Sequence, residues 1–200
     1  MTATTASAAP AGALASFTVS NPAADDAFTA ANVTGVNAVL TNVTTGATIT
    51  CSVYGAAGTA VDGVYATGAG LATINTATFG TSATKCNGPL GSKWVSSSVQ
   101  PMKLNGVTYS AGVTKGTLTG IKVNLTGTSL LGTCTATIEG TANTGSYTNG
   151  SGVLEIVPDA TPALTVTSAA GACAGLISTG NKAKFGAKYK VSPVITVTSP

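Results

Sequence analysis

The strongest constraint on the fold is a glycine-rich segment that occurs twice in the chain. Residues 63–74, GVYATGAGLATI, recur at 145–156 as GSYTNGSGVLEI, with glycines, a tyrosine and apolar residues at matching positions. The match continues upstream, where residues 33–41 align with residues 118–126. A cysteine precedes and another follows each copy of the segment. The sequence therefore predicts a duplicated unit with halves at 17–103 and 104–200.

Alternating apolar and polar residues, and turn signals between them, predict β-strands throughout. In residues 47–54, for example, Ala47, Ile49, Cys51 and Val53 share one face and threonine and serine occupy the other. Period two is typical of a half-buried strand, and no segment of ten residues shows helical periodicity. We expect an all-β fold, a sandwich or a barrel of two pseudo-symmetric halves. Residues 1–16 are expected to be a flexible segment, and residues 17–200 a single domain.

The four cysteines fall into two equivalent pairs within the repeat. Equivalence of the copies selects one connectivity, Cys51 with Cys86 and Cys134 with Cys173, so that each half contains one disulfide. A zinc site is the alternative, but zinc sites usually use closely spaced cysteines or histidines, and neither occurs here. Two disulfides indicate an oxidising compartment.

Composition argues against several classes of function. Charged residues make up 8% of the chain, against about 25% in ordinary soluble proteins, and histidine and arginine do not occur. Without histidine there is no Ser-His-Asp triad, and without arginine there is no bidentate contact to phosphate or guanine. None of the six carboxylates recurs in both copies of the repeat. We therefore expect a protein that is not an enzyme, with no cofactor, no metal, no nucleic-acid partner and no transmembrane helix.

Residues 182–191 form the most amphipathic predicted strand, with lysines on one face and apolar residues on the other. The lysines are Lys182, Lys184, Lys188 and Lys190. One interpretation is a basic surface for an anionic cell-wall polymer or lipid. The alternative, which we favour, is an edge strand whose lysines prevent pairing with another sheet.

Several motifs of the chain resemble those of small secreted proteins of actinobacteria. They are Leu-Thr-Gly-Ile near 118, Thr-Cys-Thr-Ala near 134, Tyr-Thr-Asn-Gly-Ser-Gly-Val-Leu at 147–154, Cys-x-Gly-Leu-Ile at 173 and the Ser-Pro terminus. The resemblance implies an extracellular or cell-envelope location and brings no catalytic residues. The small-residue run at 6–10, Ala-Ser-Ala-Ala-Pro, is similar to a cleavage site, and we expect a secreted precursor.

Two functions remain open from the sequence. The first is a non-enzymatic secreted or cell-surface protein with a structural, adhesive or binding role, including self-association. The second is a β-barrel pore or lipid-binding protein of a mycolate-type outer envelope. Aromatic residues, at 5% of the chain, are few for the interface girdles of a pore.

Overall fold

The structure is a computed structural model that describes residues 16–173 and 175–200. The expected flexible segment therefore lies almost wholly outside the described residues. The described part is all-β, with one short 3₁₀ turn, η1 (Pro89–Gly91). The strands are β1 (Phe17–Ser20), β2 (Ala27–Asn32), β3 (Ala38–Asn42), β4 (Thr48–Cys51), β5 (Tyr54–Thr59), β6 (Gly63–Tyr65), β7 (Ala72–Phe79), β8 (Cys86–Asn87), β9 (Lys93–Ser98), β10 (Met102–Ser110), β11 (Val113–Ser129), β12 (Gly132–Thr148), β13 (Val153–Ile156), β14 (Leu164–Gly171), β15 (Lys182–Ser192) and β16 (Thr196–Thr198).

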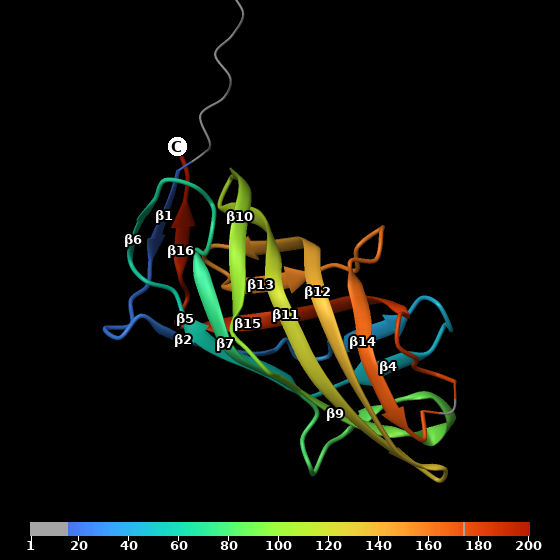
Figure 1. Ribbon diagram of the computed structural model, residues 1–200. Coiled ribbons are helices and arrows are strands. Elements are labelled where there is room, and N and C mark those ends of the chain that lie inside the picture. Colours follow the sequence, from blue (N-terminus) through green and yellow to red (C-terminus); the bar gives the residue numbers. More distant parts are fainter. Residues whose placement is uncertain (1–15, 174) are drawn as a thin grey trace, which may run out of the picture.

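The large sheet closes on itself to form a barrel with two tiers along its length. In the first tier the pairing runs β2, β5, β7, β10, β11, β12, β13 and β15, and β15 returns to β2. In the second tier it runs β3, β4, β8, β9, β11, β12, β14 and β15, and β15 returns to β3. Strands β11, β12 and β15 therefore belong to both tiers, and Figure 1 shows β11 and β12 crossing much of the length of the molecule.

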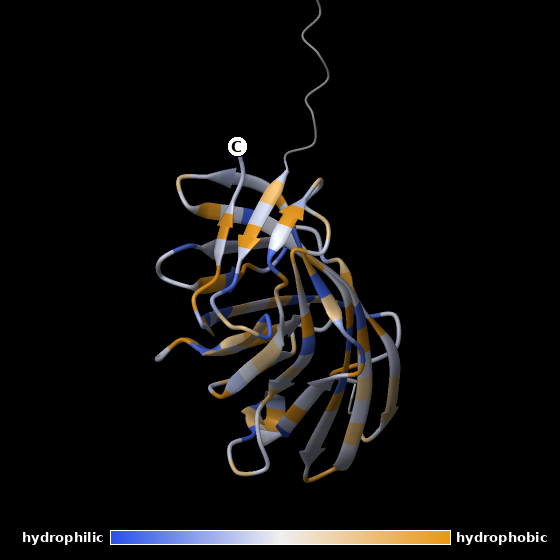
Figure 2. Cartoon of the chain, turned by 90° about the vertical axis from the view of Figure 1, so that its left-hand side faces the viewer, coloured by the Kyte–Doolittle hydropathy of each residue, from blue (hydrophilic) through white to orange (hydrophobic). Residues whose placement is uncertain are grey.

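A smaller sheet, with strand order β16, β1, β6, covers the end of the first tier. Its strands carry alternating apolar residues, and Figure 2 shows the three strands turned toward the viewer. Phe17 and Val19 of β1 and Val197 of β16 are buried against the barrel. The loop after β6 is joined to β10, since the Gly106 N–H donates to the Gly68 carbonyl at 2.8 Å. This small sheet is called the cap below.

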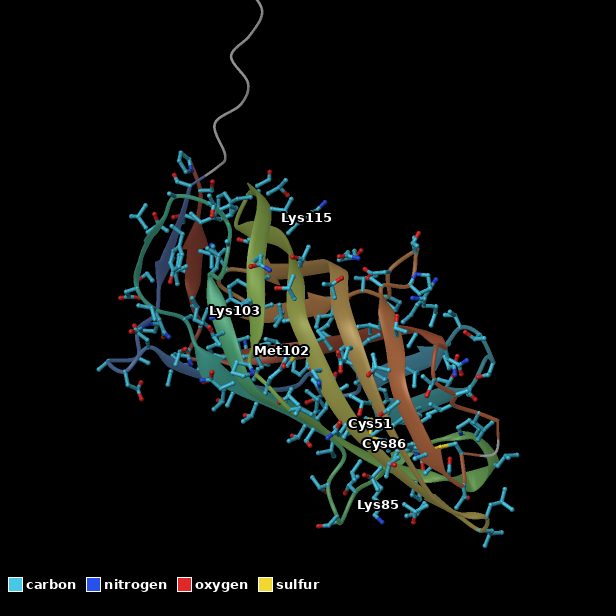
Figure 3. The ribbon with its side chains drawn as sticks, viewed as in Figure 1. Cys51, Lys85, Cys86, Met102, Lys103 and Lys115 are labelled. Atoms are coloured by element: carbon cyan, nitrogen blue, oxygen red, sulfur yellow. A yellow bond between two sulfur atoms is a disulfide. The ribbon has the colours of Figure 1, made fainter. Side chains whose placement is uncertain are left out.

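The predicted disulfides are confirmed, and each lies within its own half. Cys51 is bonded to Cys86 at 2.03 Å and Cys134 to Cys173 at 2.08 Å. The first bond reinforces the short contact between β4 and β8, which is otherwise a single residue pair, Thr50 with Asn87. Figure 3 shows this bond near the end of the second tier. The zinc alternative is therefore excluded.

The two copies of the glycine-rich segment occupy different places. In the first copy, Gly63–Tyr65 is β6 and pairs with β1 in the cap. In the second copy, the corresponding residues continue β12 and form a hairpin with β13. Gly70 and Gly152 are equivalent residues that share a left-handed backbone, with φ of 66° and 60°. Strands from both halves are interleaved in one sheet, and the pseudo-symmetry of the halves stays a prediction.

Candidate functional site

The interior of the barrel contains two small apolar pockets, which are called the first and second cavities below. The first, of about 80 Å³, lies under the cap and is lined by Val19, Leu71, Ile195 and Val197 among others. The second, also of about 80 Å³, lies against the Cys51–Cys86 disulfide and is lined by Ile74, Ile121, Trp94 and Tyr189 among others. No carboxylate or ammonium group is among the described residues that line either cavity.

The two cavities share a wall of four side chains. Phe28 of β2, Leu118 of β11, and Leu154 and Ile156 of β13 line both of them. All four are buried. In the first tier β11 lies across the barrel from β2, whereas only β15 separates β13 from β2. Rotation of these side chains would join the cavities into one elongated apolar space along the barrel.

Phe79 of β7 and Phe185 and Tyr189 of β15 line part of the second cavity, and Tyr54 of β5 packs against two of these rings. Tyr54 of β5 stacks on Phe79 of β7 with centroids 6.2 Å apart, and meets Tyr189 of β15 edge-on at 5.0 Å. Phe79 in turn meets Phe185 edge-on at 5.2 Å. Burial raises the pKa of Tyr189 far above its usual range, and the nearby Tyr54 adds to the effect. The ring is therefore neutral and part of an apolar wall.

One residue that lines the first cavity has a buried polar atom without a partner. Within residues 16–173 and 175–200, the Thr114 hydroxyl is the one buried side-chain oxygen or nitrogen that has no hydrogen bond. Thr114 lies on β11, is 6% exposed and lines the cavity under the cap. An unpartnered buried hydroxyl costs about 1–3 kcal/mol, because its hydrogen bonds to water are not replaced. A ligand atom that accepts or donates a hydrogen bond here would remove this penalty.

Side chains at the end of β12 bind the cap to the barrel. The Tyr147 hydroxyl donates to the Ile195 carbonyl at 2.7 Å, and the Asn149 amide donates to the Val197 carbonyl at 2.6 Å. Asn149 Oδ1 also accepts from the Val197 N–H at 3.0 Å. The Asn149 side chain therefore pairs with the backbone of β16 as a neighbouring strand would. The Tyr65 hydroxyl makes a shorter-range bond, to the Val61 carbonyl at 2.9 Å. Both tyrosines of the repeated segment thus make specific hydrogen bonds.

The carboxylates are held by structural partners. Glu139 pairs with Lys122 at 3.0 Å and Glu155 with Lys188 at 3.1 Å. The hydrogen bond from Lys122 lowers the pKa of Glu139. Asp159 is buried, and both of its oxygens accept from the Asn143 N–H at 3.0 Å.

Two acids are brought together near the start of β2. The Asp62 N–H donates to Asp26 Oδ1 at 3.3 Å, and Asp62 Oδ1 accepts from the Asn21 N–H. Their contacts are thus to backbone amides, in the loop that connects the cap to the barrel. We found no group of three or more potential metal ligands in the described part of the chain.

The predicted basic strand is β15, and its lysines face outward. Ala183, Ala187, Tyr189 and Val191 of this strand are buried. The edge-strand interpretation is wrong, because β15 pairs on one side with β13 and β14 and on the other with β2 and β3. The lysines also bind neighbouring strands. Lys188 pairs with Glu155, Lys182 donates to Thr165 Oγ1 at 2.8 Å, and Lys190 donates to the Ser151 carbonyl. Binding of an anionic surface by Lys182, Lys184, Lys188 and Lys190 stays a prediction.

Three comparisons with known proteins identified no relative of this chain. A scan against protein-family models, a search of curated proteins and a search of solved structures each found no match to the chain. The part of the chain that the structure describes contains no helix of the length and hydrophobicity that a membrane crossing needs. The two disulfides are compatible with an extracellular location.

Proposed function

We propose that the protein is a non-enzymatic binding protein, extracellular or of the cell envelope, that holds an apolar, lipid-like ligand inside its barrel. The observation that carries the proposal is the pair of apolar cavities separated only by Phe28, Leu118, Leu154 and Ile156. Apolar cavities of this kind stay dry and bind apolar molecules. An acyl chain is narrow enough to follow the barrel axis from one cavity to the other.

The Thr114 hydroxyl gives the ligand a direction. Among the described polar residues that line this mainly apolar cavity, Thr114 is the one whose buried side chain has no hydrogen-bond partner. A few polar groups in an apolar pocket fix the orientation of a ligand. We therefore place the ligand's polar end, a carboxyl, ester or hydroxyl group, beside Thr114, with its chain directed toward the second cavity.

The alternation of residues favours a binding protein over a pore. A membrane-spanning barrel directs apolar side chains to lipid and polar ones to its lumen. Here the pattern is reversed on β15, where Lys182 and Lys190 are exposed while Tyr189 and Val191 are buried. The engagement of the acids with lysines and backbone amides likewise supports a non-enzymatic role.

Titration with a fluorescent fatty acid, cis-parinaric acid, tests the proposal. We expect saturable binding to the wild-type protein. Ala142→Leu and Ala77→Leu add methyl groups inside the first and second cavities, and each should weaken binding about tenfold or more, since room for the chain is lost. Ala136→Leu is the matched control, because Ala136 is also buried on β12 but lines neither cavity.

The result that would overturn the proposal is an absence of saturable binding by the wild-type protein to cis-parinaric acid and to a long-chain alcohol. Equal binding by wild type and by both cavity variants would overturn it as well. Circular dichroism of each variant confirms that it is folded before the titration is interpreted.

A further inference from the structure

Three leucines project into solvent at the end of the second tier. Leu130 and Leu131 form the two-residue turn between β11 and β12, since Ser129 pairs with Gly132. Leu90 lies in η1, between β8 and β9. Their exposed fractions are 104%, 67% and 75%, and they are the exposed leucines of the described residues. These three side chains are called the leucine tip.

The backbone at Leu90 favours another residue. Leu90 has a left-handed backbone, with φ of 55° and ψ of 31°, which few residues other than glycine adopt. A leucine there has neither a conformational nor a packing advantage in the isolated protein. Such a cost at an exposed apolar position points to contact with an apolar partner.

The charges around the leucine tip are positive. Lys93 pairs with Asn87 in β8 and with Thr128 in β11, next to the turn. Lys85 precedes β8, and Figure 3 places it toward the same end of the molecule. The acid that follows the turn on β12, Glu139, is eight residues from Leu131, about 26 Å along the strand, and it is paired with Lys122. The other acids belong to the first tier and its loops.

A hollow of about 200 Å³ lies beneath the tip. Leu90, Leu130 and Leu131 line it, together with Trp94. The Trp94 ring also lines the second cavity. This ring is therefore the wall between the hollow under the leucines and the interior of the barrel, and its Nε1 donates to Ser92 Oγ at 2.8 Å.

We infer that the leucine tip docks the protein on an anionic lipid surface. The leucines enter the apolar layer while Lys85 and Lys93 meet the headgroups, as at other interfacial sites. Docking brings the lipid against the hollow that Trp94 separates from the second cavity. The docking surface is distinct from the ligand cavity and does not depend on the proposed function.

Vesicle co-sedimentation tests the inference, with phosphatidylcholine vesicles that contain or lack phosphatidylglycerol. We expect binding to the anionic vesicles, with quenching of the fluorescence of Trp94, the chain's one tryptophan, by brominated lipid. Leu130→Ser with Leu131→Ser should lower the bound fraction about tenfold or more, because two leucine side chains no longer leave water. Lys85→Gln with Lys93→Gln should lower binding to the anionic vesicles only. Val64→Ser is the matched control, since Val64 is 75% exposed on the cap.

Equal binding by wild type and the leucine variant would overturn the inference. So would a wild-type dimer that the leucine variant converts to monomer while vesicle binding stays absent, because the tip would then be a contact between copies. The cavity variant Ala142→Leu separates this inference from the proposed function: it should dock like wild type, and the leucine variant should bind cis-parinaric acid in solution like wild type.

Discussion

The Tyr147 side chain and the Ile195 backbone exchange two hydrogen bonds. The hydroxyl donates to the Ile195 carbonyl at 2.7 Å and accepts from the Ile195 N–H at 3.0 Å. These two hydrogen bonds hold the segment that leads into β16 over the first cavity. Tyr147 and Ile195 both line that cavity. Attachment of the cap therefore depends on one phenolic oxygen as well as on apolar packing.

Tyr147→Phe should destabilise the protein by about 1–3 kcal/mol, since it leaves a half-buried backbone donor and acceptor without a partner. The free energy of unfolding in urea measures the effect. Tyr65→Phe serves as the control and should cost less, because the Tyr65 hydroxyl makes one exposed bond, to Val61. Equal costs for both variants would contradict the assigned role of Tyr147.

Thr114→Val should stabilise the protein by about 1–2 kcal/mol, because an unpartnered buried hydroxyl is replaced by a methyl group of similar shape. Valine also suits a strand. If the hydroxyl meets the polar end of the ligand, the same variant should bind cis-parinaric acid less tightly while gaining stability. Thermal unfolding and the fatty-acid titration test the two parts, and a loss of stability would contradict the first.

Removal of either disulfide should lower stability by about 2–5 kcal/mol. We expect the greater loss for Cys51→Ala with Cys86→Ala, because both sulfurs are buried and β4 and β8 share only one other residue pair. Cys173 is half-buried, and β12 and β14 pair along seven residues without the bond. Urea unfolding of the two double variants gives the order, and the reverse order would contradict this account.

The protein should lose stability at alkaline pH. Burial raises the pKa of Tyr189, and also those of Tyr54 and Tyr147. The tyrosine pKa in the unfolded chain is about 10. Because the pKa is higher in the folded protein, the free energy of unfolding is unaffected below about pH 10 and falls as the pH rises above it. Urea midpoints measured across this range should decline, and Tyr189→Phe should reduce the decline. A midpoint that stays constant up to about pH 12 would contradict the prediction.

Gly127→Ala should destabilise the second tier. A Cβ at Gly127 would lie 2.5 Å from the Trp94 ring, and relieving that clash requires the ring to move, at about 1–3 kcal/mol. Tryptophan fluorescence and urea unfolding measure the displacement and the cost. Gly145→Ala is the control, since its nearest neighbours, at 3.4 Å and 3.5 Å, are at ordinary contact distance.

The sequence allowed the all-β class and both disulfides to be predicted, because strand alternation and the repeated cysteines are local signals. Closure of the barrel was not predictable, since it depends on β15 pairing with β2 and β3, which lie far away in the chain. The same pairing is why β15 is not an edge strand. The two glycine-rich segments also diverge, because one pairs with β1 and the other continues β12.

The candidate site was not predicted. Thr114 is one of many threonines, and nothing nearby in the sequence distinguishes a threonine that faces a cavity from one that faces solvent. The cavities themselves arise from contacts between distant strands. The leucine tip did have a signal, because Leu130 and Leu131 stand between Ser129 and Gly132, where alternation stops and a turn is expected.

The strand pairings that close the barrel, of β15 with β2 and β3, involve a strand close to the end of the chain. Because synthesis begins at the N-terminus, β2 and β3 have no partner on that side until residues 183–192 of β15 are available. The interior stays open to its surroundings throughout that time, and such late, long-range pairing slows folding. A hydrophobic molecule present while the chain folds would thus be enclosed as the last strands pair, without any later opening of the barrel wall.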